Sequence, residues 1–256
     1  MPTQPDLSKL SVRQFAERFK SEMIPLSNTF SYFCASVPMS EDDLKEYLEE
    51  PVAALPPAIA AALPKISILL VPYLERGNGS KEAARAKTTA AEYVSIEKPP
   101  EGKTFSSTQL KLSGETVLAF ALKGQEVAQY HYRFYHLLAA VLGDEWDETL
   151  ETRYSRILRE ELNADVHGEV DEASWRLKQV LRRSKSVTAT KAFHAYSRQS
   201  FVDTLTLYLH GICCDIDVDT GPRQLPSRYL RKRLLAFAEL FPPPQGYAVF
   251  PEELGA

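Results

Sequence analysis

The residues best suited to chemistry gather in three clusters in the second half of the chain. The first cluster is the run QEVAQYHYRFYHLL, which reads as a helix carrying His131 and His136. Their spacing corresponds to about 140° around a helix, so the two imidazoles do not easily share one metal ion. Tyr130, Phe134 and Leu138 fall on one helical face, as in a core-facing stripe. The cluster favours an aromatic core helix, with His131 as a polar site residue and His136 as a base if the protein is an enzyme.

The second cluster, REELNADVHGEVDEASW, crowds acids around one histidine. Glu161 and Asp165 stand one helical turn apart, so both carboxylates would face the same side. His167 and Glu169 follow closely, and carboxylates with an imidazole are ligands for zinc or for a hard cation. The alternative is a helix end followed by a helix that Asp171 caps, with acids that stabilise its first turn or are solvated.

The third cluster, HGICCDIDVDTGP, places His210, Cys213 and Cys214 before Asp215 and Asp217. It lacks the glycine and glutamate of an EF-hand loop and the second ligand pair of a zinc motif. It does offer Cys213 as a thiolate nucleophile. The histidines available as its base are His210, His167 and His136. The alternative is that the glycine after His210 breaks the helix, the cysteines pack as small hydrophobes and the aspartates organise a turn.

Two basic stretches stand out in an acidic chain. One is Arg228, Arg231, Lys232 and Arg233, and the other is the run RRSK at 182–185. Nucleic-acid binding would require both stretches on one surface with interleaved aromatic residues. The net charge of −4 and a pI near 5.8 oppose binding to phosphate backbones. Pairing with nearby carboxylates is favoured, and a nucleic-acid partner is not expected.

The elements that must position these clusters predict one α+β domain over residues 1–256. Its parts are N-terminal helices over 1–64, a small central antiparallel sheet over 65–123, a helical layer over 124–241 that covers the sheet, and an extended proline-rich tail over 242–256. Ser11 and Ser40 cap the first and third N-terminal helices, and a second short helix passes through Phe30 and Phe33. The helical layer comprises five segments: 125–142 ended by Gly143, then 147–164, 171–183, 188–210 and 227–240.

The predicted sheet begins with the β-branched and leucine-rich run at 66–71. A further strand is expected over 92–96, and 108–112 and 116–122 flank Ser113-Gly114 as a β-hairpin. The core predicted from these patterns is Phe15, Phe19, Ile68, Leu70, Leu118, Phe120, Phe134, Leu138, Trp175, Phe201, Leu205 and Leu235.

A strand or hairpin, a histidine-bearing helix and then a helix with Glu161 and Asp165 is similar in order to small zincin-type metallopeptidases. The resemblance covers residues 116–181. The defining H-E-x-x-H is absent, because His131 to His136 reads H-Y-R-F-Y-H with no glutamate between the histidines at that spacing. What the resemblance implies is a degenerate zincin-like member without peptidase activity.

Composition places the protein in a reducing compartment. Three cysteines give an odd count, and the adjacent pair could bridge only through a strained ring, so no disulfide framework is expected. The N-terminal run lacks a secretory signal, and no apolar run approaches the roughly 20 residues that span a bilayer. We therefore expect a cytoplasmic protein that does not enter a membrane.

Two functions are consistent with these residues. The favoured one is a non-catalytic interaction or regulatory protein with a protein partner, which predicts that the acidic and histidine clusters lie apart or are salt-bridged to arginines. The second is a metal-dependent or cysteine-dependent hydrolase, with a divalent metal such as zinc as its only expected cofactor. Its base would be Glu161 or His136, its metal ligands Asp165, His167 and His210, its nucleophile Cys213, and its further polar residues His131, Glu169, Asp215 and Asp217.

Overall fold

The computed structural model describes residues 10–77, 91–183, 190–214 and 223–250. Contacts between Cα atoms divide the chain into two compact units. We call Met1–Glu49 with Leu63–Arg133 the sheet unit, and Glu50–Ala62 with Phe134–Ala256 the helical unit. The helix-rich α+β class is confirmed, and the expectation of one domain stays a prediction.

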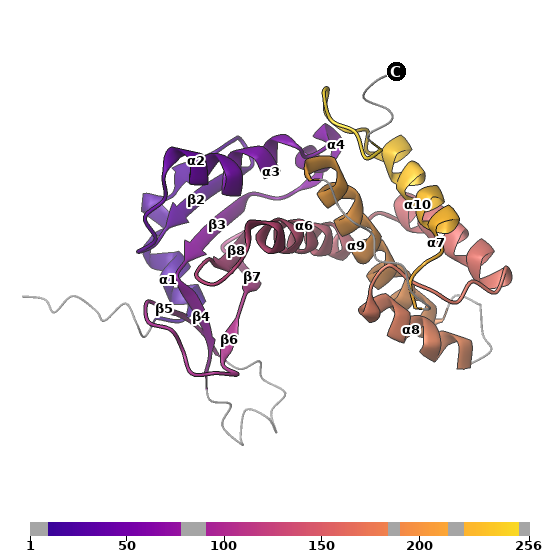
Figure 1. Cartoon of the computed structure of the whole chain (residues 1–256), viewed down its shortest axis with the longest axis horizontal. Helices are drawn as coiled ribbons and strands as arrows, with labels where there is room; N and C mark the ends of the chain where they lie inside the picture. The colour runs from indigo at the N-terminus through magenta and orange to yellow at the C-terminus, as the bar shows by residue number, and fades with distance from the viewer. Residues whose placement is uncertain (1–9, 78–90, 184–189, 215–222, 251–256) are drawn as a thin grey trace, which may run out of the picture. The chain divides into compact units, whose positions relative to one another are not determined.

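The main sheet of the sheet unit has five strands in the order β1-β2-β3-β8-β7 (Figure 1). These strands are β1 (Ile24–Pro25), β2 (Phe30–Cys34), β3 (Ile66–Val71), β8 (Glu115–Ala121) and β7 (Ser107–Leu112). The central pairs β2–β3 and β3–β8 are parallel, whereas both edge pairs are antiparallel.

This mixed sheet corrects two expectations from the sequence. Phe30–Cys34 is a strand rather than a helix, and it pairs with β3 from Phe30↔Ile66 to Cys34↔Leu70. The sheet is therefore not wholly antiparallel. The connection makes this possible, because the chain between β2 and β3 runs through several helical segments, and a parallel pair requires a long crossover of this kind. The aromatic residues of FSYFC also favour a strand, because aromatic side chains are enriched in β-sheets.

The β7–β8 hairpin is confirmed, as are the strands at 66–71 and 92–96 within one or two residues. Ser113 and Gly114 occupy its turn with φ angles of 50° and 84°. Positive φ at both central residues is the type I′ geometry, whose twist matches that of the flanking strands. The remaining strands form a three-stranded antiparallel sheet in the order β5-β4-β6, with β4 (Tyr73–Arg76), β5 (Glu92–Ser95) and β6 (Thr104–Phe105).

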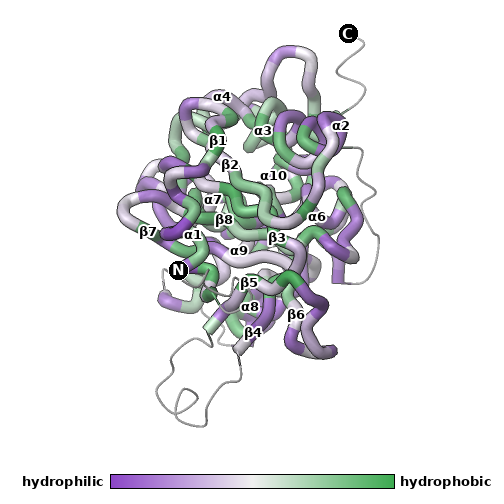
Figure 2. The backbone as a smooth tube through the Cα atoms, turned by 90° about the vertical axis from the view of Figure 1, so that its left-hand side faces the viewer, coloured by the Kyte–Doolittle hydropathy of each residue, from purple (hydrophilic) through white to green (hydrophobic). Residues whose placement is uncertain are grey.

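The core of the sheet unit lies on both faces of β3 and β8, whose tubes are coloured hydrophobic in Figure 2. Helix α1 (Val12–Arg18) covers one face, where Phe15 joins Leu69 and Val117 in a buried cluster. On the other face Phe120 meets the Tyr130 ring at 4.9 Å between ring centroids. Both faces are covered, which explains why these strands are continuously apolar rather than alternating.

The short N-terminal helices begin where the sequence predicts. Ser11 and Ser40 each accept a hydrogen bond from the third residue of their helices and complete capping boxes. The remaining short segments are η2 (Lys20–Glu22), α2 (Glu41–Leu44), the π-helical turn η3 (Lys45–Glu49), α3 (Glu50–Ala53) and α4 (Pro57–Ala62).

Five long helices follow, and they agree closely with the predicted segments. They are α6 (Val127–Asp144), α7 (Glu148–Asn163), α8 (Glu172–Arg183), α9 (Lys191–Cys213) and α10 (Ser227–Leu240). Helix α6 begins in the sheet unit and continues into the helical unit. Gly143 and Gly211 lie inside helices instead of ending them. A Cβ at Gly143 would lie 2.9 Å from Val202 Cγ2, so this glycine allows α6 and α9 to approach closely.

The core of the helical unit contains most of its predicted members, among them Phe134, Leu138, Phe201 and Leu205 at 1% exposure or less. Leu235 is the clear exception, because 40% of it is exposed on α10. Phe19 and Trp175 are only partly buried. Within the described ranges, no helix combines the length and the apolar character needed to cross a membrane.

Candidate functional site

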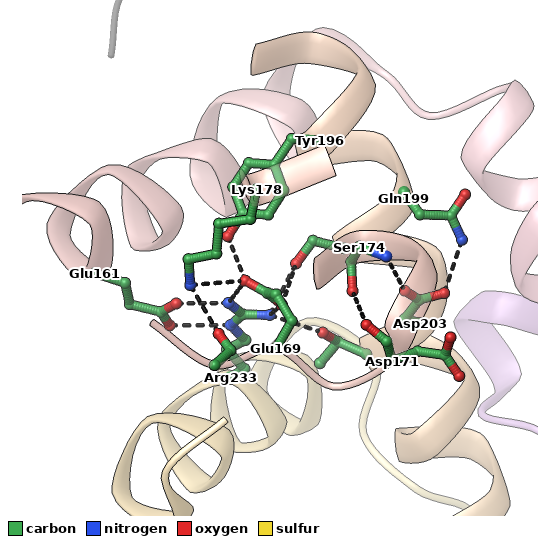
Figure 3. A network of polar contacts seen from close by, with 12 residues as sticks. Glu161, Glu169, Asp171, Ser174, Lys178, Tyr196, Gln199, Asp203 and Arg233 are labelled. Carbon is green, nitrogen blue, oxygen red and sulfur yellow. Dashed lines mark hydrogen bonds and ion pairs between the residues drawn. The ribbon is translucent and has the colours of Figure 1, made fainter. Parts of the chain in front are cut away.

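The densest polar cluster lies inside the helical unit around Arg233 (Figure 3). Arg233 sits on α10 in the buried stripe formed with Leu230, Leu234 and Phe237, and its side chain is fully buried. A charged residue on an apolar helical face must find partners inside the protein, because an unpaired buried charge is very costly.

Two carboxylates accept hydrogen bonds from the Arg233 guanidinium. Its Nε and Nη2 donate to Glu161 at 2.9 and 2.5 Å, and its Nη1 and Nη2 donate to Glu169 at 2.9 Å each. Nη1 also donates to the Ser200 hydroxyl at 2.8 Å. The planar fork of arginine suits two bidentate carboxylates in this way, and a lysine would not.

Glu169 has further partners from two other helices. Lys178 of α8 donates from Nζ to Glu169 Oε1 at 3.0 Å and to the Gly168 carbonyl at 2.8 Å. The Tyr196 hydroxyl of α9 donates to the same carboxylate oxygen. Two acids and two bases meet here with at most 1% of each residue exposed, so the buried charges balance.

The electrostatics of Glu169 follow from these contacts. Burial alone would raise the pKa of Glu169, but Arg233, Lys178 and Tyr196 together lower it to about 2. Burial and the Glu169 charge raise the pKa of Tyr196 well above its ordinary value. Glu169 is therefore a permanent carboxylate and Tyr196 a permanent donor at neutral pH, which suits a structural network rather than proton transfer.

The loop carrying Glu169 is fixed by a backbone contact. Glu169 N–H donates to the Arg223 carbonyl at 3.0 Å, and Leu225 N–H donates to the Glu169 carbonyl at 2.9 Å. A Cβ on Gly168 would lie 1.9 Å from the Gln224 carbonyl oxygen, so only glycine allows this approach. Gly168 therefore sets the position of one of the two carboxylates.

A smaller polar cluster lies beside this network around Asp203 of α9 (Figure 3). Ser174 N–H donates to Oδ2 at 3.2 Å and Gln199 Nε2 donates to Oδ1 at 2.8 Å. Burial raises the pKa of Asp203, and the hydrogen bonds only partly oppose this. His136 contributes a favourable charge interaction, and its Nδ1 lies 3.4 Å from the Thr206 hydroxyl.

The metal set suggested by the sequence does not assemble in the described residues. Asp165 and His167 are neighbours in an exposed loop, with 3.3 Å between Oδ2 and Nε2. Asp165 also accepts from Arg182 at 2.7 Å. His210 lies on α9 with its ring against Tyr135, and it does not join the other two in a three-residue ligand group within the described ranges.

The remaining predicted site residues come from different elements of the chain. His131 donates from Nε2 to the Glu46 carbonyl at 2.8 Å inside the sheet unit. Asp215 and Asp217 lie outside the described residues. Cys213 ends α9 half-buried, where hydrogen bonds from Cys214 and Tyr135 outweigh burial and lower its pKa to about 7. Glu161 is only 1% exposed and is paired with Arg233, so a substrate in solvent could not reach it and it is not placed to act as a general base.

A groove on the surface of the helical unit lies between α7 and α10, which run next to each other in Figure 1. It has a volume of about 600 Å³. Its cationic lining is Arg156, Arg228, Arg231 and Lys232. Two acids, Glu160 and Glu239, and three apolar residues, Ile157, Leu235 and Ala236, complete it. We call this feature the α7–α10 groove.

Two contacts organise the cations of the groove. Lys232 of α10 bonds Glu160 of α7 at 2.6 Å across the groove, with both side chains half exposed. The Arg231 guanidinium lies 4.2 Å from the centre of the Phe250 ring, which the C-terminal tail supplies. Just before the tail, the Tyr208 hydroxyl of α9 donates to the carbonyl of Phe241, the residue that ends α10, at 2.5 Å.

Arg233, Lys178 and Tyr196 were not among the predicted site residues. The signal for two of them was helical periodicity. Lys178 shares a buried face of α8 with Ser174 and Leu181, and Arg233 shares one of α10 with its leucines. A base at an apolar position of an amphipathic helix predicts a buried partner of opposite charge.

Comparisons with protein-family models, with curated proteins and with solved structures give no match for this chain.

Proposed function

We propose that the chain is a non-catalytic interaction protein that binds an acidic, leucine-containing segment of a partner protein in the α7–α10 groove. The observation that carries the proposal is the exposed Leu235 among four cations. Apolar area beside an excess of positive charge is what an acidic amphipathic segment would cover.

The periodicity of α10 supports this use of the groove. Its buried stripe is complete with Leu230, Arg233, Leu234 and Phe237. A second stripe, formed by Arg228, Arg231, Lys232, Leu235, Ala236 and Glu239, lines the groove instead of the core. Cations outnumber acids in this stripe although the whole chain carries a net charge of −4. This local excess favours an acidic partner.

The bonding partners of the acids predicted as catalytic, metal-binding or polar site residues also support an interaction protein. Glu161 and Glu169 bond Arg233 in the interior, and Asp165 bonds Arg182 in a surface loop. Carboxylates tied to arginines are those that the non-catalytic hypothesis expects. The hydrolase alternative keeps Cys213 as a half-buried thiol of lowered pKa, but the acids proposed to act with it, Glu161 and Asp165, bond arginines instead.

The acids of the groove make nucleic acid a less suitable partner than an acidic protein segment. Glu160 and Glu239 lie among the cations, where they would repel phosphates. Those acids can pair with basic residues that flank the acidic segment of a protein partner. The proposal therefore commits to a protein segment.

The test is fluorescence anisotropy with a labelled peptide of repeated Glu-Glu-Leu-Leu. We expect saturable binding that weakens as NaCl rises from about 50 to 500 mM. Reversal of two groove charges, Arg228→Glu with Arg231→Glu, should weaken binding roughly tenfold or more. The matched control is Arg176→Glu, an exposed change on α8 outside the groove, which should bind as the parent does.

Equal binding by the parent and the groove variant would overturn the proposal. So would tighter binding of a labelled single-stranded RNA than of the peptide, with the same loss in the groove variant. Far-ultraviolet circular dichroism and the midpoint of thermal unfolding establish that all variants are folded.

A further inference from the structure

The two adjacent cysteines of the helical unit form a pair of sulfur donors at the end of α9. The helix ends at Cys213, and Cys214 adopts an extended conformation with φ −136° and ψ 146°. Its N–H donates to the His210 carbonyl at 2.9 Å, which fixes this turn of the chain. Both side chains are half-buried, and no disulfide joins them.

The two sulfur atoms converge although they come from neighbouring residues. They lie within 4.8 Å of each other. Two thiolates bonded to one metal ion at about 2.3 Å each must lie less than about 4.6 Å apart, so the pair needs little or no adjustment to share an ion. Thiolates select soft or borderline ions such as Cu⁺ and Zn²⁺, and exclude Mg²⁺ and Ca²⁺.

The surroundings favour a bound cation. The carboxylate of Glu50, in α3 of the same unit, acts electrostatically on Cys213 and adds negative charge at the pair. Tyr135 is fully buried beside it, with its hydroxyl donating to the Pro51 carbonyl at 3.0 Å. One buried aromatic ring and one nearby acid therefore flank the pair, and neither cysteine is fully buried.

We propose that Cys213 and Cys214 bind one soft metal ion of the zinc, cadmium and copper(I) class. Each thiol gives its proton to solvent as its sulfur forms a bond to the metal. The site is separate from the α7–α10 groove and does not depend on peptide binding there.

The test is titration of the reduced protein with Cd²⁺, followed by the ultraviolet absorption of cadmium–thiolate bonds. We expect one ion per chain, with affinity at least roughly tenfold weaker in Cys213→Ser and in Cys214→Ser. Cys34→Ser is the matched control, because Cys34 is a half-buried cysteine of the sheet unit, and it should bind Cd²⁺ as the parent does. Mg²⁺ in excess should not compete.

A second measurement uses the unmodified chain, so it does not depend on folded variants. Cd²⁺ should protect Cys213 and Cys214, but not Cys34, from alkylation mapped by mass spectrometry. Absence of a cadmium–thiolate band, unchanged affinity in both serine variants, or equal protection of all three cysteines would each overturn the proposal. Peptide binding by the serine variants should equal that of the parent, so failure of this site and failure of the groove are distinguishable.

Discussion

Arg233 and Glu169 meet in the interior of the helical unit, with 2.9 Å between Nη1 and Oε2 and neither side chain exposed to solvent. They come from α10 and from the loop between α7 and α8. The pair therefore joins parts of the chain 64 positions apart. Because Glu161, Lys178 and Tyr196 complete it, the network holds four helices and one loop in a single arrangement.

Removing the guanidinium should destabilise the protein strongly. Arg233→Met leaves Glu161 and Glu169 buried without their shared cation, so that only Lys178 still pairs with Glu169. We expect the free energy of unfolding, measured by urea titration at pH 7, to fall by about 3–5 kcal/mol. Lys232→Met is the matched control, because the Lys232–Glu160 pair is half exposed, and its effect should not exceed about 1 kcal/mol. Equal effects of the two changes would contradict a structural role for the network.

The free energy of unfolding should fall at low pH, and Glu169 should account for part of the fall. Its pKa is about 2 in the folded protein against an ordinary value of 4.5. A carboxyl group whose pKa is lowered by folding stabilises the protein above its unfolded pKa, and loses that contribution as the pH falls toward the folded one. We expect the free energy of unfolding to fall between pH 4.5 and pH 2, with about 3 kcal/mol of the loss from this group.

The measurement is the urea midpoint at successive pH values. Glu169→Gln should show a smaller decline over this range than the parent, whereas Glu172→Gln, an exposed change nearby, should decline as the parent does. If Glu169→Gln and the parent lose stability in parallel, the assignment to Glu169 is wrong.

A single methyl group at Gly168 should damage the same network through the backbone. In Gly168→Ala the new carbon would overlap the Gln224 carbonyl, so the loop must move and carry Glu169 away from Arg233. We expect a loss of unfolding free energy larger than in Gly124→Ala. There the added carbon meets open space and only the left-handed backbone, with φ of 76°, costs about 1–2 kcal/mol. A smaller loss at Gly168 would show that the loop relaxes freely.

The cysteines should react at very different rates. Hydrogen bonds from Cys214 and Tyr135 lower the pKa of Cys213 to about 7, whereas burial raises that of Cys34 to about 11. Because the thiolate is the reactive form, iodoacetamide at pH 7.5 should modify Cys213 roughly a hundredfold faster than Cys34. Peptide mapping at short times measures both rates, and similar rates at the two positions would refute the ranking.

The sequence was sufficient for the local elements and insufficient for their partners. The caps at Ser11 and Ser40 and the Ser113-Gly114 turn were readable because each depends on a few adjacent residues. Strand β2 was missed, because its identity depends on pairing with Ile66–Val71 far along the chain.

The candidate site was predicted only in part. Glu161 was predicted as a catalytic base and Glu169 as a polar site residue, but their partner Arg233 was grouped with neighbouring basic residues. Arg231, Lys232 and Arg233 are adjacent in the sequence and therefore look like one basic patch. The helix separates these residues, since Arg231 and Lys232 face the groove while Arg233 faces the core. Leu235 was predicted to be buried because it is apolar. It is exposed because it lies on the stripe of α10 that lines the groove.

The most direct test of the interaction proposal is to locate the bound peptide. A Glu-Glu-Leu-Leu repeat peptide with a photoreactive phenylalanine in place of one leucine is irradiated with the full chain, and its attachment sites are mapped by mass spectrometry. We predict attachment to α7 and α10 at residues lining the groove, with Leu235 and Ile157 among them, and loss of attachment in the Arg228→Glu, Arg231→Glu variant. Attachment confined to the sheet unit, or attachment that the groove variant leaves unchanged, would contradict the account.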